Sequence, residues 1–394
     1  MKDFKYPLNI YVIWHPNFGF GKTIAEELYT AFCRDFNNPL SRGLNIPVYF
    51  RFIKLEDNMP LSINYNDAEK NAIILLIDEE YFLDDHLKNY TREIVKQAND
   101  SNRIFPIKLF EHAYNINCGL NKLQFTDAIK YFGDPLNINK SADQEKCINK
   151  IKSELLHDLS RLIWNFQDKQ EDKESQRIGS PVKLFLSHAK KDGEEIALKF
   201  KRFIEHNLKL DVFFDTVDIA NGYEFDAQFE QEITKSALVV FQTDEYSDRE
   251  WCRREVLLAK KSKSPIVVVN NIRKGERRAF PYLGNMPTTV LIDDEVVSFY
   301  RIVNLTLYQV LNNRYQLLLL EQYSKLINTD QYSVLGISSP PELFNYVHIK
   351  KISTDDKQLI VLYPDPPLGI EELDILNELD EKINFTTPTN LNCY

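Results

Sequence analysis

The alternation of strands and helices runs through this chain twice, and that repetition constrains the fold more than any single motif does. Residues 9–110 alternate short apolar, β-branched runs with segments whose apolar residues recur at helical spacing, and a long amphipathic helix is predicted at residues 144–166. The alternation restarts at residue 182 and again leads to a long helix, at about residues 296–323. Strands that alternate with helices predict a parallel sheet covered by helices.

The predicted organisation is therefore a pair of α/β domains with a small appendix. The first domain covers residues 1–166, a charged linker without aromatic residues covers 167–180, and the second domain with its long helix covers 181–325. A repeat of this length indicates two homologous domains and not a solenoid. The remaining residues, 326–394, offer one strand, a proline-rich turn and one helix, so we expect this segment to dock on its neighbours.

Composition excludes several classes of protein. A formal net charge of -10 disfavours nucleic acid as a partner, because a duplex-binding surface needs a basic face. The five cysteines are scattered without a Cys-x-x-Cys pair, so neither a disulfide framework nor a metal site is expected. The sequence shows no signal peptide and no apolar run of the roughly 20 residues that a membrane span needs, so we expect a cytoplasmic protein without a membrane partner.

The stretch "WHPNFGFGKT" at Trp14–Thr23 looks like a phosphate-binding loop but lacks the first glycine of the pattern. A Walker A loop needs glycine four residues before Gly-Lys-Ser/Thr, and this chain has Pro16 there. Proline lacks the amide N–H that the phosphate cradle requires. We therefore predict an ordinary strand-to-helix turn.

Two strands of the second domain carry polar or aromatic side chains to their carboxyl ends. "LFLSH" places Phe185 and Ser187 at the end of the first strand, and "FFDTVDIANGYEF" ends a strand at Asp215 before a loop that turns at Gly222. In an open parallel sheet, ligands bind beyond the carboxyl ends of the strands. His188 follows Ser187 directly, and adjacent strand residues face opposite sides, so the two do not form a catalytic dyad.

A helix near the same edge carries a carboxylate. "DREWCRREV" opens this helix with Trp251 and places Glu255 four residues later, which puts ring and carboxylate on one face, one turn apart. One fixed carboxylate at such an edge can stabilise positive charge that develops on a bound substrate. Aromatic faces such as Phe185 or Trp251 stack on flat rings.

Residues 181 to about 290 resemble a TIR (Toll/interleukin-1 receptor) domain. "LFLSH" is similar to the first box of that family, "FFDTVDIANGYEF" to its BB loop, and "YSDREWCRREV" to the Trp-Cys-x-x-Glu segment of the members that consume NAD⁺. "FPYLGNMP" at Phe280–Pro287 also resembles bacterial members. The match covers roughly a third of the chain.

The resemblance implies a flavodoxin-like fold and NAD⁺ glycohydrolase activity, with NAD⁺ as the substrate and no other cofactor. By position, Glu255 matches the catalytic glutamate of the family. The residues that match pocket and loop positions are Phe185, Ser187, Asp215, Gly222 and Trp251. The resemblance also implies activation by self-association, with the BB loop at residues 215–225 completing the site of a neighbouring copy.

Plainer interpretations of some of these residues remain open. Trp251 also suits core packing, and Asp215 also suits a residue that only anchors its loop. Cys252 is expected to be a small buried residue and not a nucleophile. For Glu255, the surrounding boxes favour catalysis over a surface position on a helix.

The first domain aligns with the second as a degenerate TIR-like copy. Matching "YVIWHP" to "LFLSHA" puts Trp14 at Ser187 and His15 at His188. Matching "NYTREIV" to "WCRREV" puts Asn89 at Trp251 and Glu93 at Glu255, and we expect Glu93 to be a surface residue without a catalytic role.

The leading hypothesis is a bacterial-type TIR protein that hydrolyses or cyclises NAD⁺ when assembled, as an effector of anti-phage defence. The alternative is a non-catalytic interaction module whose TIR domains only assemble. A P-loop NTPase is disfavoured by Pro16. The sequence leaves open a separate sensor or regulator subunit as a partner, and it does not identify the product or the activating signal.

Overall fold

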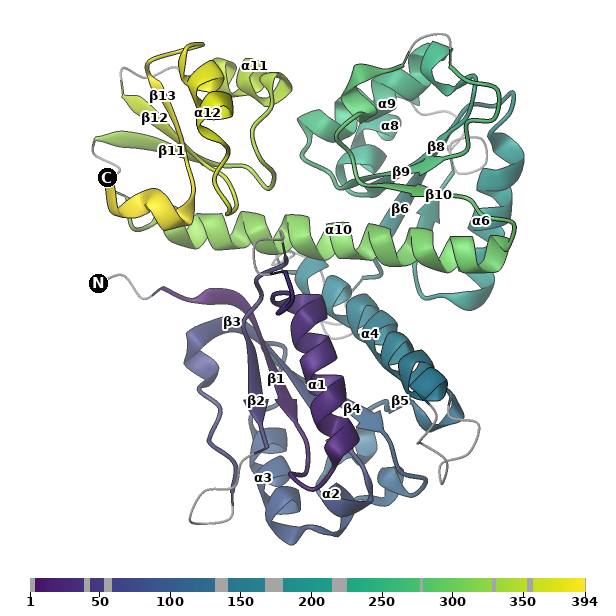
Figure 1. The fold of residues 1–394 in the computed structure, drawn as a ribbon, viewed down its shortest axis with the longest axis vertical. Helices are drawn as coiled ribbons and strands as arrows, with labels where there is room; N and C mark the ends of the chain where they lie inside the picture. Colours follow the sequence, from purple (N-terminus) through teal and green to yellow (C-terminus); the bar gives the residue numbers. More distant parts are fainter. Residues whose placement is uncertain are drawn as a thin grey trace.

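The computed structural model describes residues 4–38, 43–52, 59–131, 141–166, 180–214, 225–276, 279–327, 331–352 and 357–393. These residues form three parallel sheets and the helices that cover them (Figure 1). Asp215, Gly222 and nearly all of the predicted linker lie outside the described residues.

The first unit is a five-stranded parallel sheet with the order β2-β1-β3-β4-β5. Its strands are β1 (Tyr6–Ile13), β2 (Val48–Arg51), β3 (Ala68–Ile77), β4 (Asn102–Lys108) and β5 (Thr126–Asp127). Its helices are α1 (Gly19–Phe32), α2 (Glu79–Leu83), α3 (Asp85–Lys96) and the long α4 (Ser141–Trp164). The side chains of Asp78 and Asp84 cap α2 and α3 by accepting first-turn amide hydrogens.

The second unit repeats this arrangement, with the order β10-β9-β8-β6-β7. Its strands are β6 (Lys183–His188), β7 (Asp211–Phe213), β8 (Ala237–Gln242), β9 (Ile266–Asn270) and β10 (Thr288–Val290). Its helices are α6 (Glu194–Asn207), α8 (Phe225–Thr234), α9 (Glu250–Lys261) and the long α10 (Glu295–Ser324). Counted within each unit, both sheets have the order 2-1-3-4-5, which is the flavodoxin-like order. The predicted fold class is confirmed.

The C-terminal unit has more regular structure than the sequence predicted. It is a parallel sheet with the order β11-β12-β13, and the prediction of one strand and one helix was wrong. Its elements are β11 (Tyr332–Gly336), α11 (Leu343–Ile352), β12 (Gln358–Leu362), α12 (Ile370–Asn377) and β13 (Ile383–Thr386). A separate apolar cluster that includes Leu359 and Val361 gives it a core of its own, while Ile360 and Leu362 pack with Leu320 of α10.

Helix α10 connects all three units. Figure 1 shows it crossing the molecule between the first unit on one side and the second and C-terminal units on the other. One apolar cluster runs from β1 and α1 through α4 and α10 to β6 and β8. The first and second units therefore share a continuous core.

The described residues contain no helix that is both long and apolar enough to cross a membrane. Within the same residues there is no group of three or more His, Cys, Asp or Glu side chains placed to hold a metal ion. The four cysteines whose side chains are described, at positions 33, 118, 147 and 252, are free thiols.

Candidate active site

Three elements of the second unit bring polar side chains together near the carboxyl end of its sheet. Ser187 lies on β6, Tyr246 lies in the short 3₁₀ turn after β8, and Glu255 lies in the middle of α9. The Ser187 hydroxyl donates a hydrogen bond to Glu255 Oε2, and its oxygen lies 2.5 Å from the Tyr246 hydroxyl oxygen. Two of the site residues predicted from the sequence, Ser187 and Glu255, are thus in direct contact.

This cluster is buried. Glu255 is 4% exposed, and Ser187 and Tyr246 are almost fully enclosed. Burial, followed by the nearby negative charge of Glu255, raises the pKa of Tyr246 well above its usual value. Tyr246 is therefore a neutral phenol that supports the serine–glutamate pair.

A second layer of hydrogen bonds positions the turn that carries Tyr246. The Ser247 hydroxyl donates to Glu276, which also accepts from Gln242 Nε2 at 3.1 Å, and Arg253 Nη1 donates to the Ser247 carbonyl at 2.9 Å. The turn is thereby attached both to the end of β8 and to α9. We did not predict Tyr246 from the sequence. The sequence shows there only an aromatic residue shortly after a buried strand.

His188 and Cys252 have structural surroundings, as the sequence predicted. The His188 ring stacks on Phe214 at 4.6 Å between centroids, away from the face on which Ser187 meets Tyr246, so the two residues form no dyad. Cys252 is 3% exposed, and its thiol donates to the His188 carbonyl at 3.4 Å. It is a buried packing residue.

The two aromatic candidates differ in exposure. Phe185 is fully buried and stacks on Phe213, with 5.1 Å between the ring centroids. Trp251 is 46% exposed, which rules out the interpretation of it as a core residue, and the Arg254 guanidinium lies 4.9 Å from its ring centroid. Although one helical turn apart, Trp251 and Glu255 lie in different environments, one at the surface and one in the interior.

Comparison with known proteins assigns this part of the chain to a family. Residues 184–287 match the family model described as TIR domain. Residues 184–287 form a TIR domain. The prediction of a TIR domain in this region is confirmed.

Among solved structures, the TIR domain of the Toll-related receptor TRR-2 from Hydra magnipapillata is similar to this chain. Its identity is 16% and its TM-score 0.26, and the match covers 30% of this chain and 93% of that one. A sugar-binding protein from Salmonella typhimurium LT2 has 10% identity and a TM-score of 0.20, covering 60% and 84%. A phosphosugar isomerase from Silicibacter pomeroyi DSS-3 has 10% identity and a TM-score of 0.22, covering 78% and 85%. No curated relative matches the sequence.

Strand pairing corrects the alignment of the first unit with the TIR domain by one residue. Tyr11 pairs with Tyr49 across β1 and β2, and their rings stack at 5.2 Å, as Phe185 and Phe213 pair and stack across β6 and β7. This register puts Ile13 at the position of Ser187. The alignment of Trp14 with Ser187, and of His15 with His188, was therefore wrong, because loop residues beyond β1 had been matched to strand residues of β6.

Among the described residues of the first unit, none takes the place of Glu255. Tyr81 lies four residues after β3, as Tyr246 lies four residues after β8, but its hydroxyl meets Thr91 of α3 at 2.7 Å. Glu93 is 65% exposed and pairs with Lys96 at 2.6 Å, so its prediction as a surface residue is confirmed.

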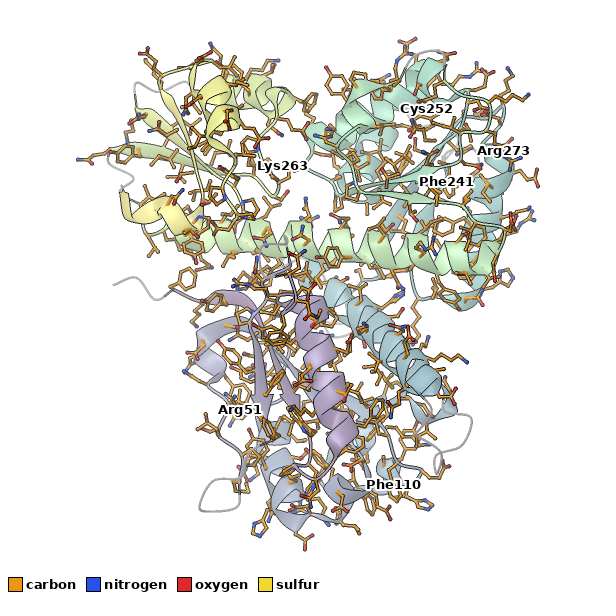
Figure 2. All side chains as sticks on the ribbon, in the orientation of Figure 1. Arg51, Phe110, Phe241, Cys252, Lys263 and Arg273 are labelled. Carbon is orange, nitrogen blue, oxygen red and sulfur yellow. The ribbon has the colours of Figure 1, made fainter. Side chains whose placement is uncertain are left out.

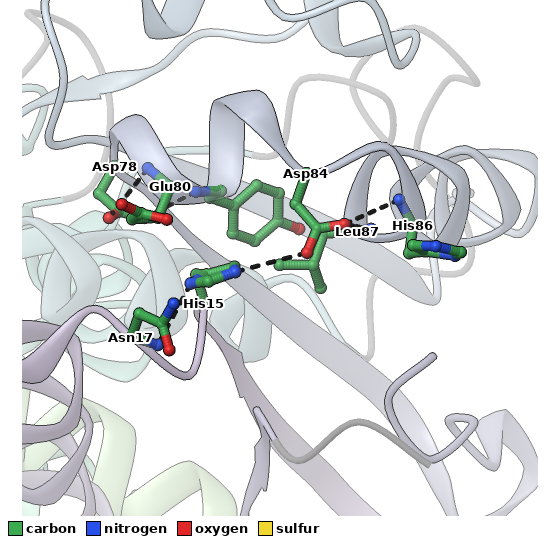
Figure 3. A network of polar contacts seen from close by, with 8 residues as sticks. His15, Asn17, Asp78, Glu80, Asp84, His86 and Leu87 are labelled. Carbon is green, nitrogen blue, oxygen red and sulfur yellow. Dashed lines mark hydrogen bonds and ion pairs between the residues drawn. The ribbon is translucent and has the colours of Figure 1, made fainter. Parts of the chain in front are cut away.

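A different polar network occupies the carboxyl end of the first sheet (Figure 3). His15 Nε2 lies 3.4 Å from Asp84 Oδ2, and His15 Nδ1 accepts from the Asn17 amide at 3.2 Å. In the stretch that resembled a phosphate-binding loop, Lys22 is exposed and its Nζ lies 3.7 Å from Glu26 Oε1. Gly21 packs against Trp14. This stretch is a strand-to-helix turn, as predicted.

Proposed function

We propose that the TIR domain cleaves NAD⁺, releasing nicotinamide and either ADP-ribose or its cyclic isomer, with Glu255 as the catalytic carboxylate. The observation that carries this proposal is the position of Glu255: a buried carboxylate held by Ser187 near the ligand-binding edge of a TIR sheet. Family resemblance alone gives a residue type at a position, whereas the hydrogen bond gives that residue a fixed orientation.

The proposed chemistry needs one carboxylate. The bond between the ribose C1′ and the nicotinamide nitrogen breaks, and its electron pair leaves with nicotinamide, which becomes neutral. The Glu255 carboxylate stabilises the positive charge that develops on the sugar. In hydrolysis, water adds to C1′ and loses a proton to solvent. In cyclisation, a nitrogen or hydroxyl of the same molecule takes the place of water.

Burial of Glu255 makes the described conformation a resting state in this proposal. At 4% exposure the carboxylate does not reach a ribose from solvent, so activation has to move Tyr246 or α9. Self-association through the TIR domain, with residues 215–225 contributing to the neighbouring site, is the proposed trigger for that movement. Such assembly-dependent removal of NAD⁺ suits an effector of anti-phage defence.

Exchange of one carboxylate tests the assignment. Glu255→Gln keeps the size of the side chain, removes the negative charge, and is expected to lower NAD⁺ cleavage by about 10²–10³-fold. Glu250→Gln is the matched control, because Glu250 is an exposed glutamate in the first turn of the same helix and is expected to keep wild-type activity. Equal loss in both variants, or full activity of Glu255→Gln, would exclude Glu255 as the catalytic group.

A scaffold without turnover is the second candidate, favoured by the burial of Glu255. In that case Ser187 and Tyr246 would only satisfy a buried carboxylate, and the purified protein would assemble without consuming NAD⁺.

A further inference from the structure

A cleft of about 600 Å³ lies between the C-terminal unit and the TIR domain, with α10 as its floor. Helix α9, strand β9 and the loop before β10 line one wall, and loops of the C-terminal unit line the other. Gly43 of the first unit also lines it, so all three units meet here. Figure 2 labels Lys263, another lining residue, between the TIR domain and the C-terminal unit. The volume lies within the range of small-molecule sites.

The floor of the cleft is a stripe of carboxamide side chains on α10. The four residues of this stripe all line the cleft, and they are Gln309, Asn312, Asn313 and Gln316. Their spacing of three and four residues places them on one face of the helix. Val310, which lies between them in sequence, belongs instead to the apolar core that the units share. The polar face of this segment therefore faces the cleft.

One half of the stripe holds the three units together. Asn313 Nδ2 donates to the Lys263 carbonyl at 3.2 Å and to Ser338 Oγ at 2.7 Å. Gln316 Nε2 donates to the Leu44 carbonyl at 3.1 Å. These bonds attach α10 to the TIR domain, to the C-terminal unit and to the first unit, so this half has a structural role.

The other half of the stripe is not used in this way. Gln309 and Asn312 are half-buried, and neither makes a hydrogen bond to any other described residue. Each carboxamide presents a donor and an acceptor side by side. Asparagine and glutamine pair through these two groups with the edge of a nucleobase, as they do with adenine. Two such side chains one helical turn apart therefore suit a flat ligand that carries both donors and acceptors.

Apolar and aromatic surfaces lie beside this half of the stripe. Tyr308 of α10 and Phe344 of α11 both line the cleft, and both rings are half-buried. Further apolar lining comes from Met286, Pro287, Pro340 and Pro341. A planar heteroaromatic ring packs favourably on surfaces of this kind.

The charges of the lining disfavour an anion. The lining contains three carboxylates and two lysines, which are Glu342, Asp365, Glu372, Lys260 and Lys263. Lys260 is paired with Glu342, with 3.0 Å between Nζ and Oε2. The Lys263 ammonium donates to the carbonyl of Gly336, which lines a neighbouring pocket. Both lysines are thus engaged within the protein, and the excess of carboxylates repels a phosphate.

We propose that this cleft binds an uncharged nucleoside, whose base pairs with Gln309 and Asn312 and packs against Tyr308 and Phe344. An uncharged compound suits the charge of the lining, and a base supplies both a flat face and an edge of donors and acceptors. A sugar alone would use the carboxamides but not the aromatic rings. Because the cleft is lined by all three units, the bound nucleoside also stabilises their arrangement.

Calorimetric titration of the full chain tests this site directly. The probes are adenosine, guanosine, cytidine and uridine, and each is compared with its 5′-monophosphate and with ribose. At least one nucleoside is expected to bind with a Kd below about 1 mM and to raise the thermal midpoint. Its monophosphate should bind at least about threefold more weakly because of the carboxylates, and ribose should not bind in this range.

Two substitutions locate the binding. Gln309→Leu and Asn312→Leu keep a side chain of similar size without the carboxamide, and each is expected to raise the Kd of the bound nucleoside at least about tenfold. Gln322→Leu is the matched control, since Gln322 is a carboxamide on the same helix that does not line the cleft. Thermal unfolding of each variant without ligand shows that it is folded.

The proposal would be overturned if no nucleoside bound at millimolar concentration, if the monophosphates or ribose bound more tightly than the nucleosides, or if folded Gln309→Leu and Asn312→Leu bound as tightly as wild type. Binding that is lost in Glu255→Gln but kept in both cleft variants would place the nucleoside at the TIR site and would equally overturn it. The readout is binding and not NAD⁺ cleavage, so this result is independent of the proposed activity of Glu255.

Discussion

Ser187 and Glu255 form a donor–acceptor pair that excludes water, so each side chain is expected to depend on the other. Removing the hydroxyl with Ser187→Ala should lower the free energy of unfolding by about 1–3 kcal/mol, because a buried charged acceptor loses a donor. In a Glu255→Gln background, Ser187→Ala should lower the free energy of unfolding by a smaller amount. Urea unfolding of the wild type, the two single variants and the double variant gives the interaction energy between the two side chains, expected at about 0.5–3 kcal/mol. Strictly additive effects would show that this contact does not form in solution.

For single residues, the sequence predicted which side chains belong to the site better than it predicted whether each one is buried. The motifs identified Ser187 and Glu255, and the structure brings them together. The spacing of Trp251 and Glu255 along one helix did not predict that one would be exposed and the other buried, because burial depends on what packs on each position. Tyr246 was missed because its role depends on a contact with Ser187, which is distant in sequence.

Helix α4 carries a partly buried acidic residue, Asp158. Burial, followed by the charge of Glu154, raises the pKa of Asp158 from 3.8 to about 6, while Arg161, Lys209 and Arg103 oppose the shift. A carboxyl whose pKa is higher in the folded protein stabilises the fold fully below the unfolded pKa. That contribution is lost as the pH rises through about 6.

Asp158→Asn is therefore expected to raise the free energy of unfolding by about 1–3 kcal/mol at pH 7, and most of this gain should be gone at pH 4. Urea unfolding at the two pH values measures the difference. Glu145→Gln, an exposed position on the same helix, is the control and should change stability little at either pH. A gain at pH 4 equal to that at pH 7 would contradict this account of Asp158.

Regular elements were predictable where their periodicity was strong. The long helix expected at about residues 296–323 spans Glu295–Ser324, because its apolar positions repeat over many turns. Strands β11 and β13 were missed because their short sequences contain Ser, Gly, Asn and Thr among the apolar residues. The alignment error at Ile13 arose because the motif match ran past the end of β1. The register is fixed by the pairing of β1 with β2, which the motif match did not contain.

In the whole molecule, α10 connects the TIR domain to the first unit. Tyr315 is fully buried and donates to the Asn45 carbonyl at 3.4 Å, and Gln316 Nε2 donates to the Leu44 carbonyl at 3.1 Å. Leu307 and Leu311 belong to the same shared core. Such a continuous core was not visible in the sequence, which showed two similar halves but not how they pack.

A fragment of residues 180–394, without the first unit, would leave this apolar side of α10 uncovered. We expect a thermal midpoint clearly below that of the full chain and binding of a dye that reports exposed apolar surface. Differential scanning fluorimetry and dye titration on both proteins measure these effects. A fragment as stable as the full chain and without dye binding would show that the shared core adds no stability.

We propose that the TIR domain of this chain cleaves NAD⁺ when the protein assembles. The most direct measurement follows NAD⁺ and nicotinamide chromatographically while the concentration of purified protein is raised, and then in a fusion that forces oligomers. We expect nicotinamide release that rises more steeply than protein concentration, and the second product distinguishes hydrolysis from cyclisation. NAD⁺ that remains intact at every concentration and in the forced oligomer would show that the TIR domain does not cleave NAD⁺ and acts as a scaffold.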